Sequence, residues 1–201
     1  MAKGSEFERE FCKDLSLWWT YGEREDIFWR SSNSGGRATV RAARGKTTSG
    51  QYGDVAAIDV SGNPLLELVT IELKRGYSKH TIQDVFDRKP KSAIQQWEKW
   101  YEQTVISANN AKSISWLLIT RRDQRDSLVY MPSKFYESLC LSGSFAVEPS
   151  PILQFTTRIR LSPLSNFTKI DPDPDITMMR WEDWKEGTSQ MKLQDAMKEL
   201  R

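Results

Sequence analysis

The chain has 201 residues, the size of one ordinary domain, so we expect a single domain with its own hydrophobic core. Apolar residues make up 38% and charged residues 28%, which argues against a disordered chain, and no apolar run approaches the roughly 18 residues that a membrane-spanning helix needs. The formal net charge is only +2, so no strongly basic overall field indicates a nucleic-acid partner.

The N-terminal sequence MAKGSEFERE is charged from its third position and has no apolar stretch before a cleavage site. We therefore expect a cytoplasmic protein without a membrane partner or a secretory signal. Cys12 and Cys140 are too few for a disulfide framework or a zinc knuckle, and His80 is the only histidine. Both cysteines are predicted to be core residues.

The first predicted element is an amphipathic helix over residues 5–20, where apolar residues recur at helical spacing and Ser5 can cap the N-terminus. A short strand over residues 27–30 follows. The Gly-, Ser- and Arg-rich sequence from there to Gly53 predicts a long loop. Residues 54–60 and 65–74 then predict a β-hairpin, because Ser-Gly-Asn-Pro between them is typical of a turn.

The second half of the chain predicts further helices and strands. The apolar stripe of the second long helix indicates core packing. The expected elements are a helix over 92–107, strands over 114–120 and 127–131, a short helix over 132–140, a strand over 153–161, an acidic turn over 171–175 and a charged amphipathic helix over 190–200.

These elements predict an α/β fold with a mixed central β-sheet flanked by helices. We assign residues 1–170 to this domain. Residues 171–201 are predicted to form an acidic turn and an amphipathic helix that packs on the domain or serves association. For Trp181 and Trp184 we expect only packing against the sheet.

One pair of charged side chains indicates phosphodiester chemistry. In the sequence Ile-Glu-Leu-Lys, Glu72 and Lys74 point to the same face of a strand, because strand side chains alternate. Metal-dependent hydrolysis needs carboxylates for the cation and a positive charge near the phosphate. Asp54 brings a second carboxylate if its strand pairs with this one, and Gly53 leaves room for a close backbone approach.

Glu8 is a candidate for a third carboxylate. At about 100° per residue, it lies about 35° from the centre of the apolar face of the first helix, whereas Glu6 and Glu10 lie more than about 120° away. An inward-facing glutamate is rarely buried unless it is paired or binds a metal. The alternative is a glutamate at the edge of the stripe that reaches solvent or pairs with Arg9 or a neighbouring strand.

Between Asp26 and Asp54 the chain has no acidic residue. This stretch contains five basic residues among Ser, Gly and Thr: Arg30, Arg37, Arg41, Arg44 and Lys46. Such a composition fits either a segment along a phosphate backbone or a solvated loop.

The segments KGSEFEREF, RSSNSGG, QYGDVAAIDV and IELKRG resemble the PD-(D/E)xK nuclease superfamily, in particular its archaeal-type Holliday-junction resolvases. The resemblance covers residues 3–80 and is weaker beyond them. It implies a restriction-endonuclease-like fold in which Glu8, Asp54, Glu72 and the Leu73 carbonyl bind Mg²⁺ (or Mn²⁺). It also implies that Lys74 positions or deprotonates the attacking water and stabilises the developing charge. By the same resemblance, Ser34 lies near the scissile phosphate.

The chain departs from the resolvase pattern in places. Gly53 replaces the usual proline, and Asp54 lies farther from Glu72 than is common in resolvases. Asp59, 13 residues before Glu72, has a more resolvase-like spacing, but it would sit on the opposite strand face from Asp54.

We therefore predict a metal-dependent DNA endonuclease without a nucleotide cofactor, acting on duplex or branched DNA. The predicted phosphate contacts are Arg37, Arg41, Arg44, Lys46, Arg75 and Lys79. A junction resolvase acting in DNA recombination would need a homodimer to cut two strands symmetrically. The alternatives are a restriction-type or phage recombination nuclease, a non-catalytic DNA-binding or assembly module on the same fold, and an acidic-substrate or protein-interaction domain.

Overall fold

The computed structural model describes residues 3–31, 52–77, 79–145, 151–162 and 170–188, together with Gln190 and Leu193. At its centre is a five-stranded sheet with the order β3-β4-β5-β7-β6, in which β3 and β4 are parallel and the other pairs antiparallel. The strands are β3 (Val69–Arg75), β4 (Ser115–Arg121), β5 (Ser127–Pro132), β6 (Leu153–Thr156) and β7 (Asp175–Arg180). The predicted mixed α/β class is confirmed, and the architecture is compatible with a restriction-endonuclease-like fold.

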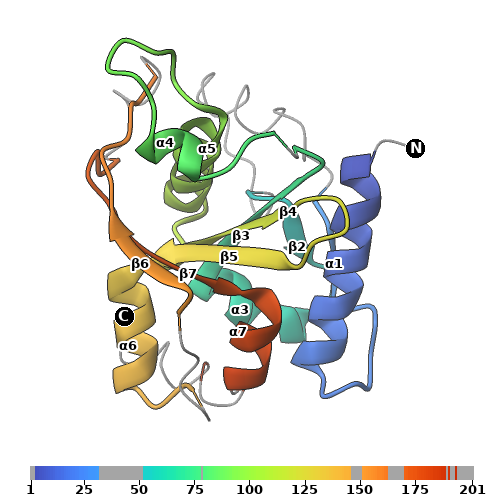
Figure 1. Ribbon diagram of the computed structural model, residues 1–201. Helices are drawn as coiled ribbons and strands as arrows, with labels where there is room; N and C mark the ends of the chain where they lie inside the picture. The colour runs from blue at the N-terminus through green and yellow to red at the C-terminus, as the bar shows by residue number, and fades with distance from the viewer. Residues whose placement is uncertain are drawn as a thin grey trace.

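Helices cover both faces of the sheet (Figure 1). One face packs on α1 (Lys3–Trp19), α3 (Asn63–Leu68), α6 (Ser133–Leu141) and α7 (Trp181–Gly187). The other face packs on α4 (Gln83–Phe86) and α5 (Gln96–Ala111). Two separate hydrophobic clusters result, one on each side of the sheet. None of the helices among the described residues is long and apolar enough to cross a membrane.

Side-chain alternation along β3 divides its residues between the two faces. Ile71 and Leu73 belong to the core beneath α1, whereas Glu72 contacts α5 on the other side. The predicted common orientation of Glu72 and Lys74 is confirmed by the ion pair between them. The strand therefore buries Ile71 and Leu73 on the α1 side and presents Glu72 and Lys74 on the other, while Arg75 at its end faces acidic residues of α1.

The predicted β-hairpin is wrong. β2 (Val55–Ala57) pairs antiparallel with β1 (Phe28–Arg30) and not with β3, and η1 (Val60–Gly62) and α3 fill the predicted turn and the start of the second strand. Pro64 lies in the first turn of α3, where its missing N–H costs no helical hydrogen bond. Leu65 and Leu68 then share one buried helical face. The spacing of these apolar residues therefore suits a helix, with its 3.6-residue period, and not the predicted strand.

Strand β7 was not predicted from the sequence, and it lies inside the sheet between β5 and β6. Its four central residues are all buried, so they show no alternation of apolar and polar positions. Part of the segment after residue 170 thus completes the sheet. Of the helix predicted over 190–200, the structure describes Gln190 and Leu193, and Leu193 is buried in the core.

The other predicted elements agree with the structure apart from their boundaries. The helices over 5–20, 92–107 and 132–140 correspond to α1, α5 and α6, and the strands over 27–30, 114–120, 127–131 and 153–161 to β1, β4, β5 and β6. The predicted long loop lies mostly outside the described residues, which omit 32–51. Cys12 is buried as predicted, and Cys140 is partly buried against the core.

Polar contacts hold α7 against α1. Asp14 accepts hydrogen bonds from Trp181 Nε1 at 3.0 Å and from Lys185 Nζ at 2.8 Å. Trp184 stacks on Trp181 with ring centroids 4.8 Å apart and contacts Trp18 at 5.1 Å. Helix α7 therefore fixes the position of α1, the helix that carries Glu8.

Replacing Trp184 with alanine tests this packing. Trp184 is 1% exposed, so Trp184→Ala should lower the free energy of unfolding by about 3–5 kcal/mol, the usual cost of emptying a buried aromatic site. Trp29→Ala is the matched control, because Trp29 is 48% exposed and its loss should cost less than about 1 kcal/mol. Equal losses in urea-induced unfolding would contradict the packing.

Candidate active site

Asp54 lies beside the edge strand β3. Its backbone N–H donates to the Ile71 carbonyl at 2.9 Å, and its carboxylate Oδ2 accepts from the Leu73 N–H at 2.8 Å. The N–H and C=O of one strand residue point to the same side of the strand. The Leu73 carbonyl therefore points to the edge where Asp54 lies.

Glu72 is held from three sides although its side chain is only 2% exposed. Ser107 Oγ donates to Oε1 at 2.8 Å, and Gln103 Nε2 donates to Oε2 at 3.2 Å. Lys74 Nζ donates to the same Oε2 at 3.1 Å. Two neutral donors of α5 thus fix the orientation of a buried carboxylate that would otherwise be costly.

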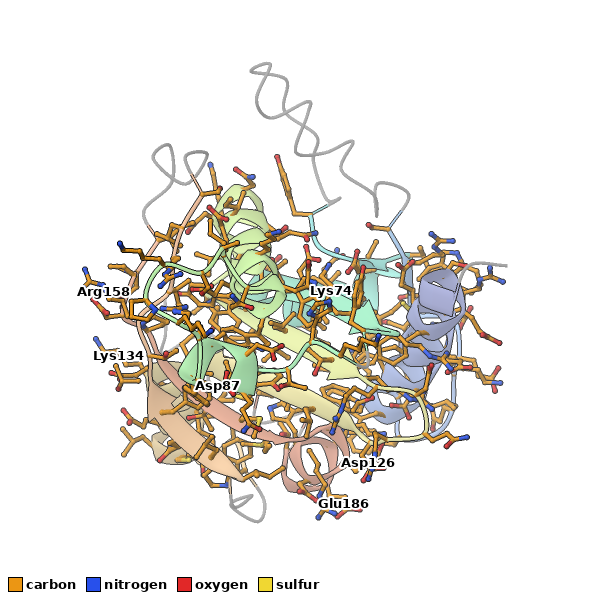
Figure 2. All side chains as sticks on the ribbon, turned by 45° about the horizontal axis from the view of Figure 1, so that its top comes forward. Lys74, Asp87, Asp126, Lys134, Arg158 and Glu186 are labelled. Carbon is orange, nitrogen blue, oxygen red and sulfur yellow. The ribbon has the colours of Figure 1, made fainter. Side chains whose placement is uncertain are left out.

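Lys74 links the two carboxylates. Its Nζ lies 3.1 Å from Glu72 Oε2 and 3.8 Å from Asp54 Oδ2. Figure 2 shows Lys74 near the middle of the molecule, whereas other labelled charges such as Lys134 and Glu186 lie at the periphery. The three side chains form what we call the Asp-Glu-Lys cluster (Asp54, Glu72 and Lys74).

The surroundings of the cluster raise the pKa of two of its members, Asp54 and Lys74. Burial, the charge of Glu72 and a hydrogen bond with Glu72 raise the pKa of Asp54 well above its usual 3.8. Burial acts to lower the pKa of Lys74, but the charges of Glu72 and Asp54 outweigh it and raise that pKa above 10.5. Lys74 is therefore an ammonium group, and Asp54 readily retains a proton when no other cation is present.

The donor set of the cluster fits one hard divalent cation. Mg²⁺ is commonly held by one or two carboxylates and completes its shell with waters and substrate phosphates. Asp54 and Glu72 supply two carboxylates, and the Leu73 carbonyl points to the same edge. Among the described residues, no group of three or more His, Cys, Asp or Glu side chains is placed to hold a metal ion. The fit therefore rests on two carboxylates.

Glu8 is not part of the Asp-Glu-Lys cluster. It faces inward as predicted, with 15% of its side chain exposed against 62% for Glu6 and 48% for Glu10. Its Oε2 lies 3.0 Å from Arg30 Nε on the neighbouring strand β1. Cys12, one turn further along α1, has its pKa raised to about 12 by burial and then by the charges of Glu8 and Asp54. Glu8 thus lies on the α1 side of the cluster.

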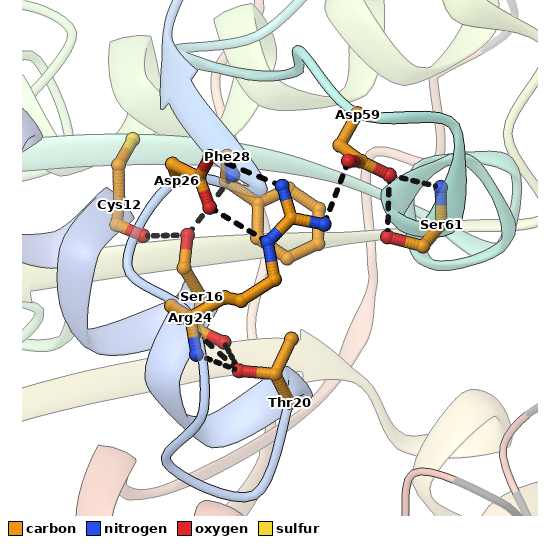
Figure 3. A network of polar contacts seen from close by, with 8 residues as sticks. All are labelled: Cys12, Ser16, Thr20, Arg24, Asp26, Phe28, Asp59 and Ser61. Carbon is orange, nitrogen blue, oxygen red and sulfur yellow. Dashed lines mark hydrogen bonds and ion pairs between the residues drawn. The ribbon is translucent and has the colours of Figure 1, made fainter.

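Asp59, the alternative second carboxylate, is engaged elsewhere. Figure 3 shows its carboxylate between Arg24 and Ser61, at 2.8 Å from the Arg24 guanidinium and 2.9 Å from the Ser61 N–H. Hydrogen bonds from Ser61 and then Arg24 lower the pKa of Asp59 to about 2. Asp59 caps η1 and ties it to Arg24 in the segment that follows α1, and the aspartate beside Glu72 is Asp54.

The predicted phosphate contacts fall into two groups. Arg37, Arg41, Arg44 and Lys46 lie outside the described residues, as does Ser34, which the resemblance places near the scissile phosphate. Lys79 is exposed in the segment after β3. Arg75 faces three carboxylates, with Nη1 3.8 Å from Glu6 and 3.7 Å from Glu10, and Nε 3.9 Å from Asp123.

Two residues of α5 that hold Glu72, Gln103 and Ser107, were not predicted from the sequence. Their spacing of four residues puts them on one helical face, and this polar pair beside an apolar stripe was the available signal. Their partner could not be read from the sequence, because Glu72 lies 31 and 35 residues away along the chain.

Gly53 permits the close contact between Asp54 and β3. Its φ of +78° belongs to the left-handed region, and a Cβ at this position would lie 2.7 Å from the Ile71 carbonyl oxygen and 2.8 Å from Thr70 Cγ2. Any side chain here would push the Asp54 backbone away from the strand. The glycine that replaces the proline of the motif is thus required by the local geometry.

An aspartate and a Glu-x-Lys pair meet at the edge strand of a mixed sheet that helices cover. This is the arrangement expected of a PD-(D/E)xK nuclease. The family described as "Phage putative PDDEXK endonuclease" matches residues 1–173, and the chain belongs to this family. Membership in this family supports nuclease activity for the chain and implies DNA as the substrate. No curated protein and no solved structure matches the chain.

Asp54→Asn should make the metal-free protein more stable at neutral pH. A carboxyl whose pKa is raised on folding contributes stability that is fully present below its unfolded-state pKa and lost as the pH rises through the folded-state pKa. An amide does not have this penalty, so the advantage of the variant should grow from pH 4 to pH 8 in thermal unfolding. Mg²⁺ should stabilise the wild type and not the variant. A stability difference between variant and wild type that does not change from pH 4 to pH 8 would refute the shift.

Gly53→Ala should displace Asp54, and Gly22→Ala provides the matched control. Gly22 has a φ of +91°, but a Cβ there meets no atom within 4 Å. Both variants should lose about 1–2 kcal/mol of stability from left-handed strain, and Gly53→Ala should lose more because its Cβ would also meet the Ile71 carbonyl oxygen. Only Gly53→Ala should also lose DNA cleavage. Unchanged cleavage by Gly53→Ala would show that the approach of Asp54 to β3 is not needed.

Proposed function

We propose that this chain is a metal-dependent DNA endonuclease whose active site is the Asp-Glu-Lys cluster. The observation that carries the proposal is the pair of buried carboxylates, Asp54 and Glu72, beside the ammonium group of Lys74. When both buried carboxylates are ionised, one lysine leaves an excess negative charge, which is costly in a structural role and useful for binding a cation. Family membership supports the same class of reaction.

Asp54, Glu72 and the Leu73 carbonyl are the proposed ligands of Mg²⁺ or Mn²⁺. When bound, such a cation would lower the pKa of a bound water and neutralise charge on the phosphate. The protein supplies the orientation of its ligands. Ser107 and Gln103 hold Glu72, and the Leu73 N–H holds Asp54. These donors act as positioning groups.

Lys74 acts as a cation in the proposed reaction. Its raised pKa keeps the ammonium protonated, so it can orient a water molecule and stabilise the negative charge that develops on the phosphate. The two carboxylates that raise this pKa would be partly neutralised by a bound metal. Charge stabilisation is therefore the role that the surroundings of Lys74 favour.

Glu8 is proposed as a third acidic residue of the site, on the basis of the resemblance of its segment to the nuclease motif. In the structure Arg30 holds its carboxylate on the α1 side of the cluster. We propose that Glu8 acts from this position, either on the metal or on the solvent around it. Ser34 and the basic residues Arg37, Arg41, Arg44, Lys46, Arg75 and Lys79 are proposed to contact the DNA backbone, so binding should weaken steeply with salt.

The preferred DNA structure distinguishes the candidate nucleases. A Holliday-junction resolvase is one, because residues 3–80 resemble that branch, and it requires two copies of the chain for symmetric cleavage. A nuclease acting on linear or flapped duplex is the other, and the phage family to which the chain belongs is compatible with it. A DNA-binding module without turnover would bind these DNAs without metal-dependent cutting.

Cleavage of labelled DNA provides the test. Four-way junction, flap, linear duplex and single strand are incubated with the wild type in Mg²⁺, Mn²⁺ or EDTA, and the oligomeric state is measured in parallel. We expect cleavage only with a divalent cation. Lys74→Ala should lower kcat by about 100- to 1,000-fold, the usual effect of removing one donor at a developing charge. Glu72→Gln and Glu8→Gln test the acids.

Matched controls come from the exposed surface. Lys134→Ala and Glu186→Gln replace the same residue types at the periphery of the molecule, and they should cleave like the wild type (Figure 2). Cleavage that persists in Glu72→Gln and Lys74→Ala would place the active site elsewhere. DNA binding with no cutting under any metal condition would indicate the non-catalytic module.

A further inference from the structure

A pocket opens directly beside the Asp-Glu-Lys cluster, between the sheet and the segment that contains α4 and α5. Its volume is about 230 Å³, and Lys74 forms part of its wall. Pockets for drug-sized ligands are larger, about 300–1,000 Å³, so this one fits a single small ring system. Nothing in the proposed hydrolysis itself uses this space.

Aromatic side chains dominate the pocket wall. Tyr77 stands at the rim, 45% exposed, with its ring edge-on to Trp100 at 4.9 Å and 64°. Deeper in the pocket, Trp97 packs edge-on to Tyr130 at 5.4 Å and 69°. The pocket therefore combines buried aromatic faces with one accessible ring, a surface on which a flat ligand can stack.

The polar groups of the pocket include basic side chains, the His80 imidazole, hydroxyl groups and the Gln83 amide. Lys74, His80 and Arg122 line it, and none of its lining residues in the described part of the chain is an aspartate or glutamate. Thr120 and Tyr130 contribute hydroxyl groups. Arg121 also borders the pocket, but its guanidinium donates to Glu10 at 3.1 Å on the α1 side. Arg122 is therefore the exposed arginine that a phosphate at the rim would meet.

A nucleotide combines the properties that this pocket selects: a flat base and an anionic phosphate. Lys74 belongs both to the pocket and to the cluster, so a phosphate at Lys74 would lie beside the two carboxylates while the attached base entered the pocket. A base in a stacked duplex cannot reach such a site without leaving its neighbours. The pocket thus favours a strand with an unpaired base next to the cut.

We propose that this pocket binds one unstacked base of the DNA, adjacent to the scissile phosphate, with Tyr77 as its stacking partner and Arg122 as a phosphate contact. This inference rests on the proposed nuclease function and adds a substrate class to it. The preferred substrates are DNAs in which a base is already unpaired: mismatches, flaps and single strands. Binding of a fully paired duplex must also overcome the free-energy cost of unpairing and unstacking one base, a few kcal/mol in enzymes that flip a base.

Binding without metal tests the pocket separately from cleavage. Three duplexes of one sequence are compared by fluorescence anisotropy in EDTA: fully paired, with one mismatch, and with two abasic sites opposite each other at the same position. The wild type should bind the mismatched duplex about 5- to 100-fold more tightly than the other two, the range expected for one base–aromatic stack. A duplex with abasic sites on both strands is flexible at this position, as a mismatched duplex is, but offers no unpaired base there.

The variants identify the stacking residue. Tyr77→Ala should abolish the preference for the mismatch, while Tyr21→Ala should keep it, because Tyr21 is a 67% exposed tyrosine beyond the end of α1. Arg122→Ala should weaken binding of all three duplexes, and Arg125→Ala, an exposed arginine of the same turn that does not line the pocket, should have a smaller effect. Thermal unfolding checks that each variant is folded.

Each outcome decides one claim. Equal binding of the mismatched and abasic duplexes, or a preference that survives in Tyr77→Ala, would overturn the base pocket even if the wild type cleaves DNA. Failure of the wild type to bind any of the three duplexes would overturn the base pocket as well. A mismatch preference without any metal-dependent cleavage would leave the pocket in place and refute the nuclease.

Discussion

The structure depends on the contact between Asp54 and the edge of β3. One backbone hydrogen bond to Ile71 and one side-chain hydrogen bond from the Leu73 N–H fix the aspartate there, and Gly53 provides the room. Because β3 is the edge strand of the sheet, its outer side is free to receive this segment. The contact brings the β1–β2 pair, α1 and the sheet into one unit, and places Asp54 beside Glu72.

This arrangement costs stability in the absence of a cation. Two carboxylates share a buried space with one lysine, and the pKa of Asp54 rises because its ionised form is disfavoured there. Asp59 is the counterexample in the same chain: its carboxylate has Arg24 and Ser61 as partners, and its pKa falls. The contrast separates an aspartate that stabilises the fold from one that is suited to binding a metal.

Helix α5 connects the proposed chemistry with the proposed recognition of a base. Its Gln103 and Ser107 hold Glu72, while Trp97 and Trp100 form the wall of the neighbouring pocket. Lys74 contacts both regions. A single rigid helix on the sheet can therefore align a phosphate with the carboxylates and direct the attached base into the pocket, which is how binding energy contributes to orientation.

The sequence by itself determined the local features: the helix that turns Glu8 inward, the alternation that puts Glu72 and Lys74 on one face, and the motif that identifies the superfamily. Only the tertiary structure decided that β2 pairs with β1, that residues 63–68 form a helix, that β7 enters the sheet, and that Gln103 and Ser107 meet Glu72. The physical reason is the range of the interactions. Periodicity and turn residues report contacts a few positions apart, whereas strand pairing and the partners of a buried carboxylate join residues far apart in the chain, and depend on the packing of the whole core.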